Sequence, residues 1–110
     1  MSDPRCSKVS CTNDGGFAGA LSANWTHAGQ EMQSDTTEVY YNPNTKTIDL
    51  MPSYSKGQIS NGDSVWLRWH MQGGPNHDSG DNVTFDPNSD ASVNYSITGG
   101  VLNPSFHQHD

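Results

Sequence analysis

Three side chains that commonly contact ligands alternate along the segment Ser64–Met71. Trp66, Arg68 and His70 occupy every second position, so in a β-strand they point to the same side. The positions between them hold apolar residues typical of a protein core, namely Val65, Leu67, Trp69 and Met71. The pattern predicts a strand with one buried face and one face that carries an indole, a cation and an imidazole.

A face of this kind suits recognition better than catalysis. Sugars present apolar C–H faces and many hydroxyl groups, so Trp66 beside Arg68 and His70 indicates a glycan site. His77 and Asp78, in the polar loop that follows, are expected to contribute contacts. The same face could instead lie against lipid headgroups, where Trp is enriched. As a further alternative, both faces of the sheet are covered and Trp66 belongs to the core.

Oxygen-rich and histidine-rich segments are candidate metal sites. The loops 76–81 and 86–90 offer oxygen ligands of the kind that Ca²⁺ takes, but the EF-hand spacing is missing. His107 and His109 alternate near the C-terminus and could ligate a metal together with His70, His77 and Asp110, although the sequence does not fix their geometry. We therefore expect no metal and no cofactor, with calcium as an unsupported alternative.

No signature of an enzyme stands out. The nucleophile motif G-x-S-x-G is absent, and neither cysteine lies in a setting that would activate a thiol. The sequence therefore favours a protein that binds without catalysing. A metal-dependent enzyme that uses the histidines stays open as an alternative.

The charge balance excludes two classes of partner. The formal net charge is −7, and the five Lys and Arg residues form no cluster. Nucleic-acid binding needs a basic footprint that neutralises phosphates, so no nucleic-acid partner is expected. No apolar run reaches the length of about 18 residues that crosses a bilayer, so no transmembrane segment is expected.

The two cysteines, Cys6 and Cys11, bear on the cellular compartment. Two thiols alone cannot complete a tetrahedral zinc site, so a local disulfide is predicted, with free thiols as the alternative. The glycosylation triplets at Asn24, Asn82 and Asn94 matter only in a secretory pathway. The predicted disulfide implies an oxidising compartment, so we expect a secreted or extracellular protein. The sequence shows no signal peptide, and a cytoplasmic protein is therefore the alternative.

Turn signals separate short β-rich segments along the chain. One hairpin is predicted for Thr36–Tyr41 with Lys46–Met51. A second is predicted around the Asn61-Gly62 turn, with Ser64–Met71 as its outgoing strand. Residues 28–35 are predicted as a loop.

The expected fold is all-β, an antiparallel β-sandwich of six to eight short strands. Residues 1–16 are expected to form an N-terminal arm and residues 17–110 a single β-sandwich domain. The protein is expected to be a monomer or a dimer.

Several short motifs resemble those of the aegerolysins, small β-sandwich proteins of fungi and bacteria. They are Ser22-Ala23-Asn24-Trp25, the segment GQISNG that spans residues 57–62, Gly73-Gly74 and Phe85-Asp86-Pro87. The chain is shorter than that family's members and lacks their C-terminal Trp-Cys segment, so no lipid-contact residue is carried over. The resemblance implies binding to specific membrane lipids, in some members with a partner protein that forms a pore.

Recognition of a cell-surface glycan is thus the leading expectation. Binding to a membrane lipid headgroup, as in a cytolysin-type protein, comes second. A metal-dependent protein and a secreted effector that acts on a partner protein complete the alternatives.

Overall fold

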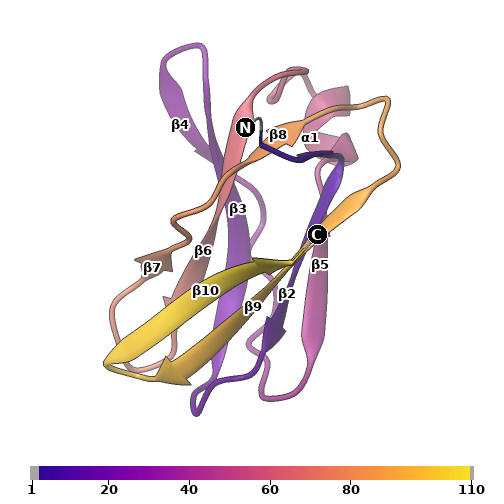
Figure 1. Cartoon of the computed structure of the whole chain (residues 1–110). Coiled ribbons are helices and arrows are strands. Elements are labelled where there is room, and N and C mark those ends of the chain that lie inside the picture. The colour runs from indigo at the N-terminus through magenta and orange to yellow at the C-terminus, as the bar shows by residue number, and fades with distance from the viewer. Residues whose placement is uncertain (1–2, 110) are drawn as a thin grey trace.

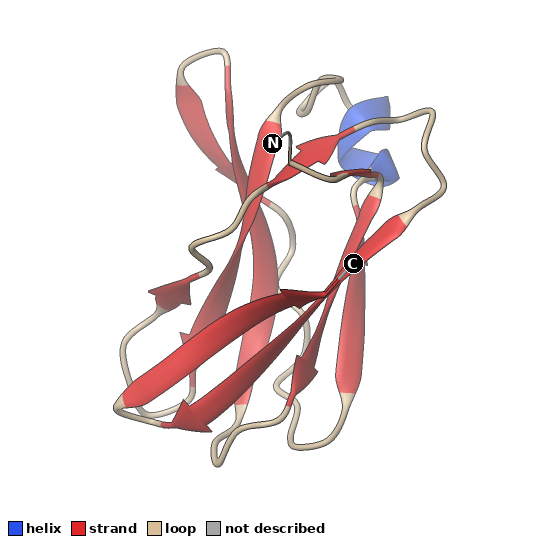
Figure 2. Cartoon of the chain, in the orientation of Figure 1, coloured by secondary structure: helices blue, strands red, loops and turns tan. Residues whose placement is uncertain are grey.

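The chain folds into two layers of β-sheet, seen in a computed structural model that describes residues 3–109 (Figures 1 and 2). The elements in the described part are β1 (Arg5–Cys6), β2 (Lys8–Asn13), β3 (Gly19–His27), β4 (Gln30–Gln33), β5 (Thr45–Asp49), α1 (Met51–Ser55), β6 (Ser64–Met71), β7 (His77–Asp78), β8 (Val83–Phe85), β9 (Ser92–Gly100) and β10 (Asn103–His109). Sheet A has the strand order β1-β8-β6-β3-β4, with β7 also paired to β6. Sheet B has the order β10-β9-β2-β5.

The predicted all-β sandwich is confirmed, but its sheets are mixed rather than antiparallel. β1 runs parallel to β8, and β2 runs parallel to β9. Ten strands lie in the described part of the chain, more than the six to eight predicted. Alternation of apolar residues identifies a strand but not the direction of its partner, so the sequence pattern could not reveal the parallel pairs.

The N-terminal residues belong to the sandwich rather than to an arm. β1 lies in sheet A and β2 in sheet B, so the chain crosses between the sheets at Ser7. The Leu50 N–H donates to the carbonyl oxygen of Ser7 at 2.9 Å, which fixes this crossing. Val9 is fully buried in the core. The predicted arm 1–16 is therefore wrong over residues 3–16.

Aromatic side chains fill much of the space between the sheets. Trp25, Trp69, Tyr95 and Phe85 are the largest fully buried side chains among the residues described. Tyr40 meets Trp69 edge to face, with ring centroids 5.2 Å apart, an arrangement that aromatic rings favour. Bulky rings thus form a core in a chain that has few aliphatic residues.

β3 and β4 form a hairpin in the stretch that was predicted as a loop. Ala28 and Gly29 make its two-residue turn, with φ angles of 51° and 79°. Such turns need positive φ at both positions, and Ala rarely adopts it, so the turn signal was weak. The chain then follows β3 as an irregular edge. Its N–H groups donate to β3 carbonyl oxygens at 2.8 Å in the pairs Ser34–Ala23, Thr37–Leu21 and Tyr40–Gly19.

Both predicted hairpins are wrong, although the strand Ser64–Met71 is confirmed with the predicted bounds. β5 pairs with β2 and not with residues 36–41. Gly62 does lie in a turn, at a φ of 96°, but β6 pairs with β3, β7 and β8 instead of the residues before that turn. The main partners of β5 and β6 are β2 and β3, which are distant in the sequence, so local turn signals could not identify them.

The structure also corrects the predicted disulfide. Cys6 and Cys11 are both buried free cysteines, one in sheet A and the other in sheet B. Residues in a strand advance about 3.3 Å each, so Cys11 cannot reach Cys6 without disrupting the pairing of β2. Burial raises the pKa of the Cys11 thiol to about 12 and also raises the pKa of Cys6. Both thiols are therefore protonated and unreactive near neutral pH.

Candidate functional site

The outer face of sheet A carries the polar side chains predicted on β6. Trp66, Arg68 and His70 are half-buried and alternate with the buried residues of the same strand, which are Val65, Leu67, Trp69 and Met71. Trp66 lies outside the hydrophobic core that the two sheets enclose. The alternative that placed Trp66 in this core is therefore wrong.

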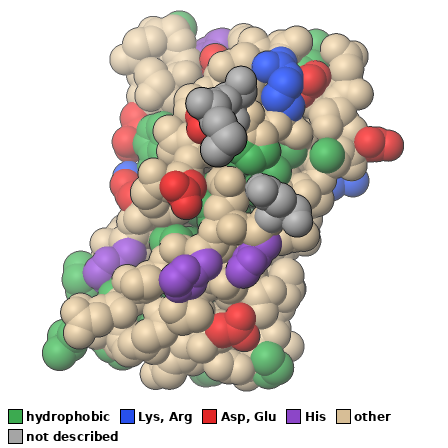
Figure 3. All heavy atoms as spheres, in the orientation of Figure 1, with side chains coloured by type: hydrophobic (Ala, Val, Ile, Leu, Met, Phe, Trp, Pro, Cys, Tyr) green, Lys and Arg blue, Asp and Glu red, His purple; other side chains and the backbone are tan. Residues whose placement is uncertain are grey.

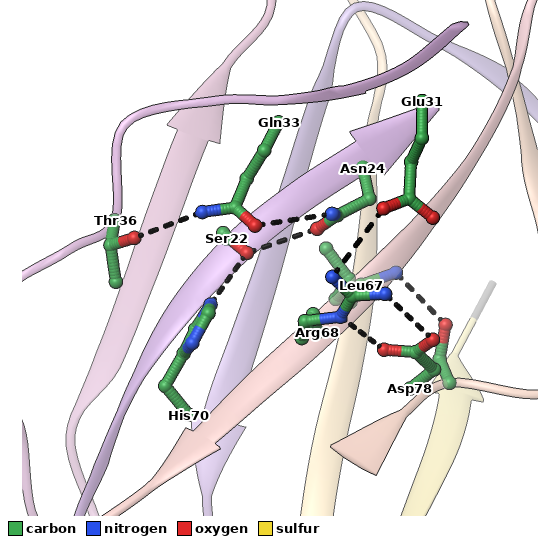
Figure 4. A network of polar contacts seen from close by, with 10 residues as sticks. Ser22, Asn24, Glu31, Gln33, Thr36, Leu67, Arg68, His70 and Asp78 are labelled. Atoms are coloured by element: carbon green, nitrogen blue, oxygen red, sulfur yellow. Dashed lines mark hydrogen bonds and ion pairs between the residues drawn. The ribbon is translucent and has the colours of Figure 1, made fainter. Parts of the chain in front are cut away.

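A line of hydrogen bonds crosses this face from β6 through β3 to β4 (Figure 4). His70 Nε2 lies 2.8 Å from Ser22 Oγ, and Ser22 Oγ donates to Asn24 Oδ1 at 3.0 Å. Asn24 Nδ2 then donates to Gln33 Oε1 at 3.3 Å. A hydroxyl has one proton, so Ser22 must accept from His70, whose proton therefore sits on Nε2. Ser22 and Asn24 are fully buried, and this line satisfies them.

Arg68 is held by two carboxylates on the same face (Figure 4). Its Nε donates to Asp78 Oδ1 at 2.6 Å and its Nη2 donates to Asp78 Oδ2 at 3.1 Å. The remaining terminal nitrogen lies 3.7 Å from a carboxylate oxygen of Glu31. The hydrogen bond to Asp78 raises the pKa of Arg68. Two of the five guanidinium N–H groups thus donate to Asp78, and two carboxylates balance the charge of Arg68 within the protein.

His70 also has a shifted pKa on this face. Burial lowers the pKa of His70 below its usual value of 6.5, and the charge of Arg68 lowers it further, while Asp78 acts in the opposite direction. The neutral imidazole is therefore favoured in the folded protein. It serves as a hydrogen-bond donor to Ser22, whose own proton is donated to Asn24 and not to the imidazole.

The structure brings together four of the five predicted ligand contacts. Trp66, Arg68, His70 and Asp78 lie on or beside one face. His77 pairs with Trp69, which faces the core, so His77 is turned away from the other four. Its Nε2 is buried, with no hydrogen-bond partner among the residues described. Contact of these residues with a ligand stays a prediction.

Sequence analysis missed the residues that complete the face. Ser22 and Asn24 were not assigned to a site, although they alternate on β3 directly opposite Arg68 and Trp66. Glu31 and Gln33 lie on β4, which was predicted as a loop. The Ala28-Gly29 dipeptide was the signal that could have placed these residues next to β3.

The other candidate metal ligands stay apart. His107 and His109 point away from the core on β10, where their Nε2 atoms meet the hydroxyls of Thr98 at 3.0 Å and Ser96 at 2.8 Å. Asp110 lies outside the described residues. Within residues 3–109, no group of three or more His, Cys, Asp or Glu side chains is placed to hold a metal ion.

Apolar side chains are exposed at one end of the sandwich, which we call the loop end. It comprises the loops 14–18, 39–44, 72–76 and 101–102. Leu102, in the turn between β9 and β10, is 88% exposed, and its neighbour Val101 is 37% exposed. Tyr41 and Val39, on a second loop, are 60% and 45% exposed. Figure 3 shows hydrophobic side chains protruding at this lower end of the molecule.

Hydrogen bonds tie these loops to one another. The Gly16 N–H donates to the carbonyl oxygen of Gly99 at 2.9 Å, which joins the first loop to the end of β9. Asn42 Nδ2 donates to the carbonyl oxygen of Gly15 at 3.2 Å, which joins the loop 14–18 to the loop 39–44. The loop end is therefore one connected surface, whose four loops contain a single charged residue, Asp14.

No family model and no curated protein sequence matches this chain. Among solved structures, it is similar to the membrane-binding domain of pneumolysin, with 17% identity over 94% of this chain and 95% of that one, at a TM-score of 0.47. It is also similar to listeriolysin O, at 15% identity and a TM-score of 0.48 over 93% of this chain. Suilysin from Streptococcus suis, at 15% identity, covers 94% of this chain at a TM-score of 0.46.

The chain spans 22% of the length of listeriolysin O and 23% of suilysin. At these identities and TM-scores, no functional residue of those proteins is transferred to this chain. The similarity to aegerolysins stays a prediction. No helix in the described part of the chain is long and apolar enough to cross a membrane.

Proposed function

We propose that the protein binds the surface of a lipid bilayer through the loop end, as a recognition domain. The observation that carries this proposal is Leu102, which is 88% exposed at the turn between β9 and β10. Exposed apolar residues that gather in one place mark contact surfaces. Membrane-lipid binding was the second expectation from the sequence. The geometry favours it over a glycan contact at Arg68, whose charge is already paired with carboxylates within the protein.

The position of these residues supports a bilayer as the partner. Leu102 and Val101 occupy the tip of a hairpin, and Tyr41 lies on a separate loop of the same end. Protruding loop tips can insert into the headgroup layer separately. Their apolar side chains then reach the hydrocarbon, and their polar backbone stays in the hydrated headgroup layer. Tyr is well suited to that boundary because its ring is apolar and its hydroxyl is polar.

The negative charge of the protein restricts the lipid composition of the bilayer that it can bind. The formal net charge of −7 opposes binding to anionic lipids, and the loop end contains no Lys or Arg to attract them. Electrostatic adsorption of the kind that basic amphipathic helices use is therefore excluded as the driving force. The partner is a zwitterionic or neutral lipid surface. Burial of apolar side chains alone must then supply the binding free energy.

The strength of this contact follows from the area available. Complete burial of a Leu, Val or aromatic side chain contributes about 1.5–3 kcal/mol. Leu102, Val101 and Tyr41 are partly covered already, so together they supply roughly 5 kcal/mol, a dissociation constant on the order of 0.1 mM. A single domain would therefore bind weakly and reversibly. Stable attachment requires several copies or a second contact.

Sedimentation with vesicles tests the proposal. The full chain is mixed with phosphatidylcholine vesicles over a range of lipid concentrations, and the bound fraction is measured. We expect saturable binding that high NaCl does not weaken, and weaker binding when phosphatidylserine is added. Leu102→Ser should reduce the affinity about tenfold, since 1.4 kcal/mol corresponds to that factor.

Tyr54→Ser is the matched control, because Tyr54 is 41% exposed on α1, outside the loop end. It should bind vesicles as the unmodified protein does. An absence of binding to phosphatidylcholine at all lipid concentrations, or equal binding by Leu102→Ser, would overturn the proposal. Stronger binding to phosphatidylserine would contradict the assignment of apolar burial as the driving force.

A further inference from the structure

A small polar hollow opens at the side of the sandwich, between the end of β4, the end of β5 and α1. Its volume is about 170 Å³, and we call it the edge hollow. It lies away from the loop end. β5 begins beside that end at Thr45 and reaches the hollow at Asp49, about 13 Å further along the strand. The edge hollow is therefore a separate feature from the proposed membrane contact.

The lining of the edge hollow combines a small apolar floor with polar walls. Ile48, almost completely buried, and Pro52 supply apolar surface. Asp35 and Asp49 present carboxylates, and Lys56 presents an ammonium group. Acceptors and a cationic donor thus surround a patch that can pack against C–H groups. A polyhydroxylated ring has this combination of properties, with hydroxyls around its edge and C–H groups on its faces.

Several of these polar groups have no internal partner. Neither Lys56 nor Asp35 takes part in an ion pair within residues 3–109. Asp49 uses one carboxylate oxygen, Oδ1, to accept the Met51 N–H at 3.0 Å, which leaves the other available. This differs from the outer face of sheet A, where the guanidinium of Arg68 is paired with Asp78 through two hydrogen bonds.

The rim of the edge hollow is anchored to the core. Gln58 lines it, and the backbone carbonyl oxygen of Gln58 accepts a hydrogen bond from Trp25 Nε1 at 2.8 Å. The Gln58 N–H donates to the carbonyl oxygen of Ser53 at 2.9 Å, which closes the segment after α1. Trp25 is fully buried, so this side of the hollow is preformed. A preformed site loses less conformational entropy when a ligand binds.

We propose that the edge hollow binds one ring of a neutral sugar, either free or at the end of a glycan. Its volume of about 170 Å³ is below the roughly 300 Å³ at which sites for drug-sized ligands begin, so it admits a single ring and not a chain. Two carboxylates against one ammonium group disfavour an anionic ligand. Glycan recognition, the leading expectation from the sequence, is thereby moved from the Trp66 face to this hollow.

A site for one small ring binds weakly. A monosaccharide has few atoms, and each contributes modestly, so a dissociation constant of about 1 mM or above is expected. Weak single sites of this kind act on surfaces that carry many copies of the same sugar, where linked binding events raise the overall strength. The proposal is independent of the membrane contact, although both could act on one cell surface.

Two-dimensional NMR titration of the full ¹⁵N-labelled chain tests the site. Glucose, galactose, mannose and N-acetylglucosamine are added separately to tens of millimolar, with sialic acid as the anionic comparison. We expect at least one neutral sugar to give saturable amide shifts centred on the lining of the edge hollow. Lys56→Met should weaken that binding at least several-fold. Lys46→Met, a change of the same kind on β5 outside the lining, should not.

The variants also separate this proposal from the proposed function. Leu102→Ser should weaken vesicle binding and keep the sugar shifts unchanged. Lys56→Met should weaken sugar binding and keep vesicle binding unchanged. The absence of saturable shifts with every neutral sugar would overturn the inference. So would shifts centred on Trp66, which would place the sugar on the outer face of sheet A, or a stronger response to sialic acid.

Discussion

The indole ring of Trp69 lies directly against the backbone of Gly19. A Cβ atom at Gly19 would be 2.5 Å from Trp69 Nε1 and 2.7 Å from the carbonyl oxygen of His70. Real Cβ contacts are essentially never so short, so only glycine fits there without displacing the ring or the strand. The approach of β3 to β6 beside the core thus depends on a missing side chain.

Replacement of Gly19 by Ala should therefore destabilise the protein. We expect a loss of about 1–3 kcal/mol in the free energy of unfolding, because the added methyl group overpacks a closed site. Urea denaturation followed by tryptophan fluorescence measures it. Gly80→Ala is the control, since nothing lies within 4 Å of the Cβ it would add. Equal losses in the two variants would contradict the tight contact between Gly19 and Trp69.

Trp66 and Trp69 should respond differently to truncation. Trp69 is completely buried, so Trp69→Ala should cost about 3–5 kcal/mol and leave little folded protein. Trp66 is half-buried on the outer face, so Trp66→Ala should cost clearly less. Urea midpoints of the two variants give the comparison. A loss for Trp66→Ala as large as that for Trp69→Ala would show that Trp66 is a core residue.

Stability should fall in mild acid partly because of His70. Its pKa is lowered in the folded protein by burial and by Arg68, so the unfolded chain takes up the proton at a higher pH. The contribution of neutral His70 is therefore complete above pH 6.5, its ordinary value, and is lost as the pH falls through the lowered pKa. His70→Gln removes the titration and keeps a donor for Ser22. Its drop in Tm between about pH 7.5 and pH 5 should be smaller.

The matched control for the acid effect is His107→Gln, on the exposed strand β10. This variant should lose as much Tm over the same pH interval as the unmodified protein. If His70→Gln is as acid-sensitive as the unmodified protein, the coupling between His70 and folding is absent.

The cysteines should behave as protected thiols. Cys6 and Cys11 are buried, and burial raises the pKa of each, so a thiol reagent should find neither in the native protein. After unfolding in guanidinium chloride, both should react. A count of no thiols in the unfolded, unreduced protein would show that the disulfide expected from the sequence forms after all.

Local patterns predicted some elements of this fold well. β6 has the predicted bounds and the predicted faces. Val65, Leu67 and Trp69 alternate with more exposed residues, so one face of the strand is buried and the other is not. β2 was missed because only Val9 and Cys11 alternate with its polar residues, which is too short an apolar pattern to indicate a strand. Its partners β5 and β9 are distant in the sequence, and no local signal identifies partners at such a separation.

The candidate site was predictable to a similar degree. The common face of Trp66, Arg68 and His70 follows from alternation, and the structure places them on it. Engagement of Arg68 by Asp78 and Glu31 needed the positions of β7 and β4. The loop end and the edge hollow were not predicted, since each gathers residues from several separate segments that only the fold brings together.

The crossing of the N-terminal segment from sheet A to sheet B has a consequence for how the molecule is made. β2 sits inside sheet B, and its parallel partner β9 is synthesised much later, since Ser10 bonds Asn94, which lies 84 residues further along the chain. Pairings between such distant residues form slowly because a long loop must close first. During translation, β2 therefore stays unpaired on this side until β9 has left the ribosome.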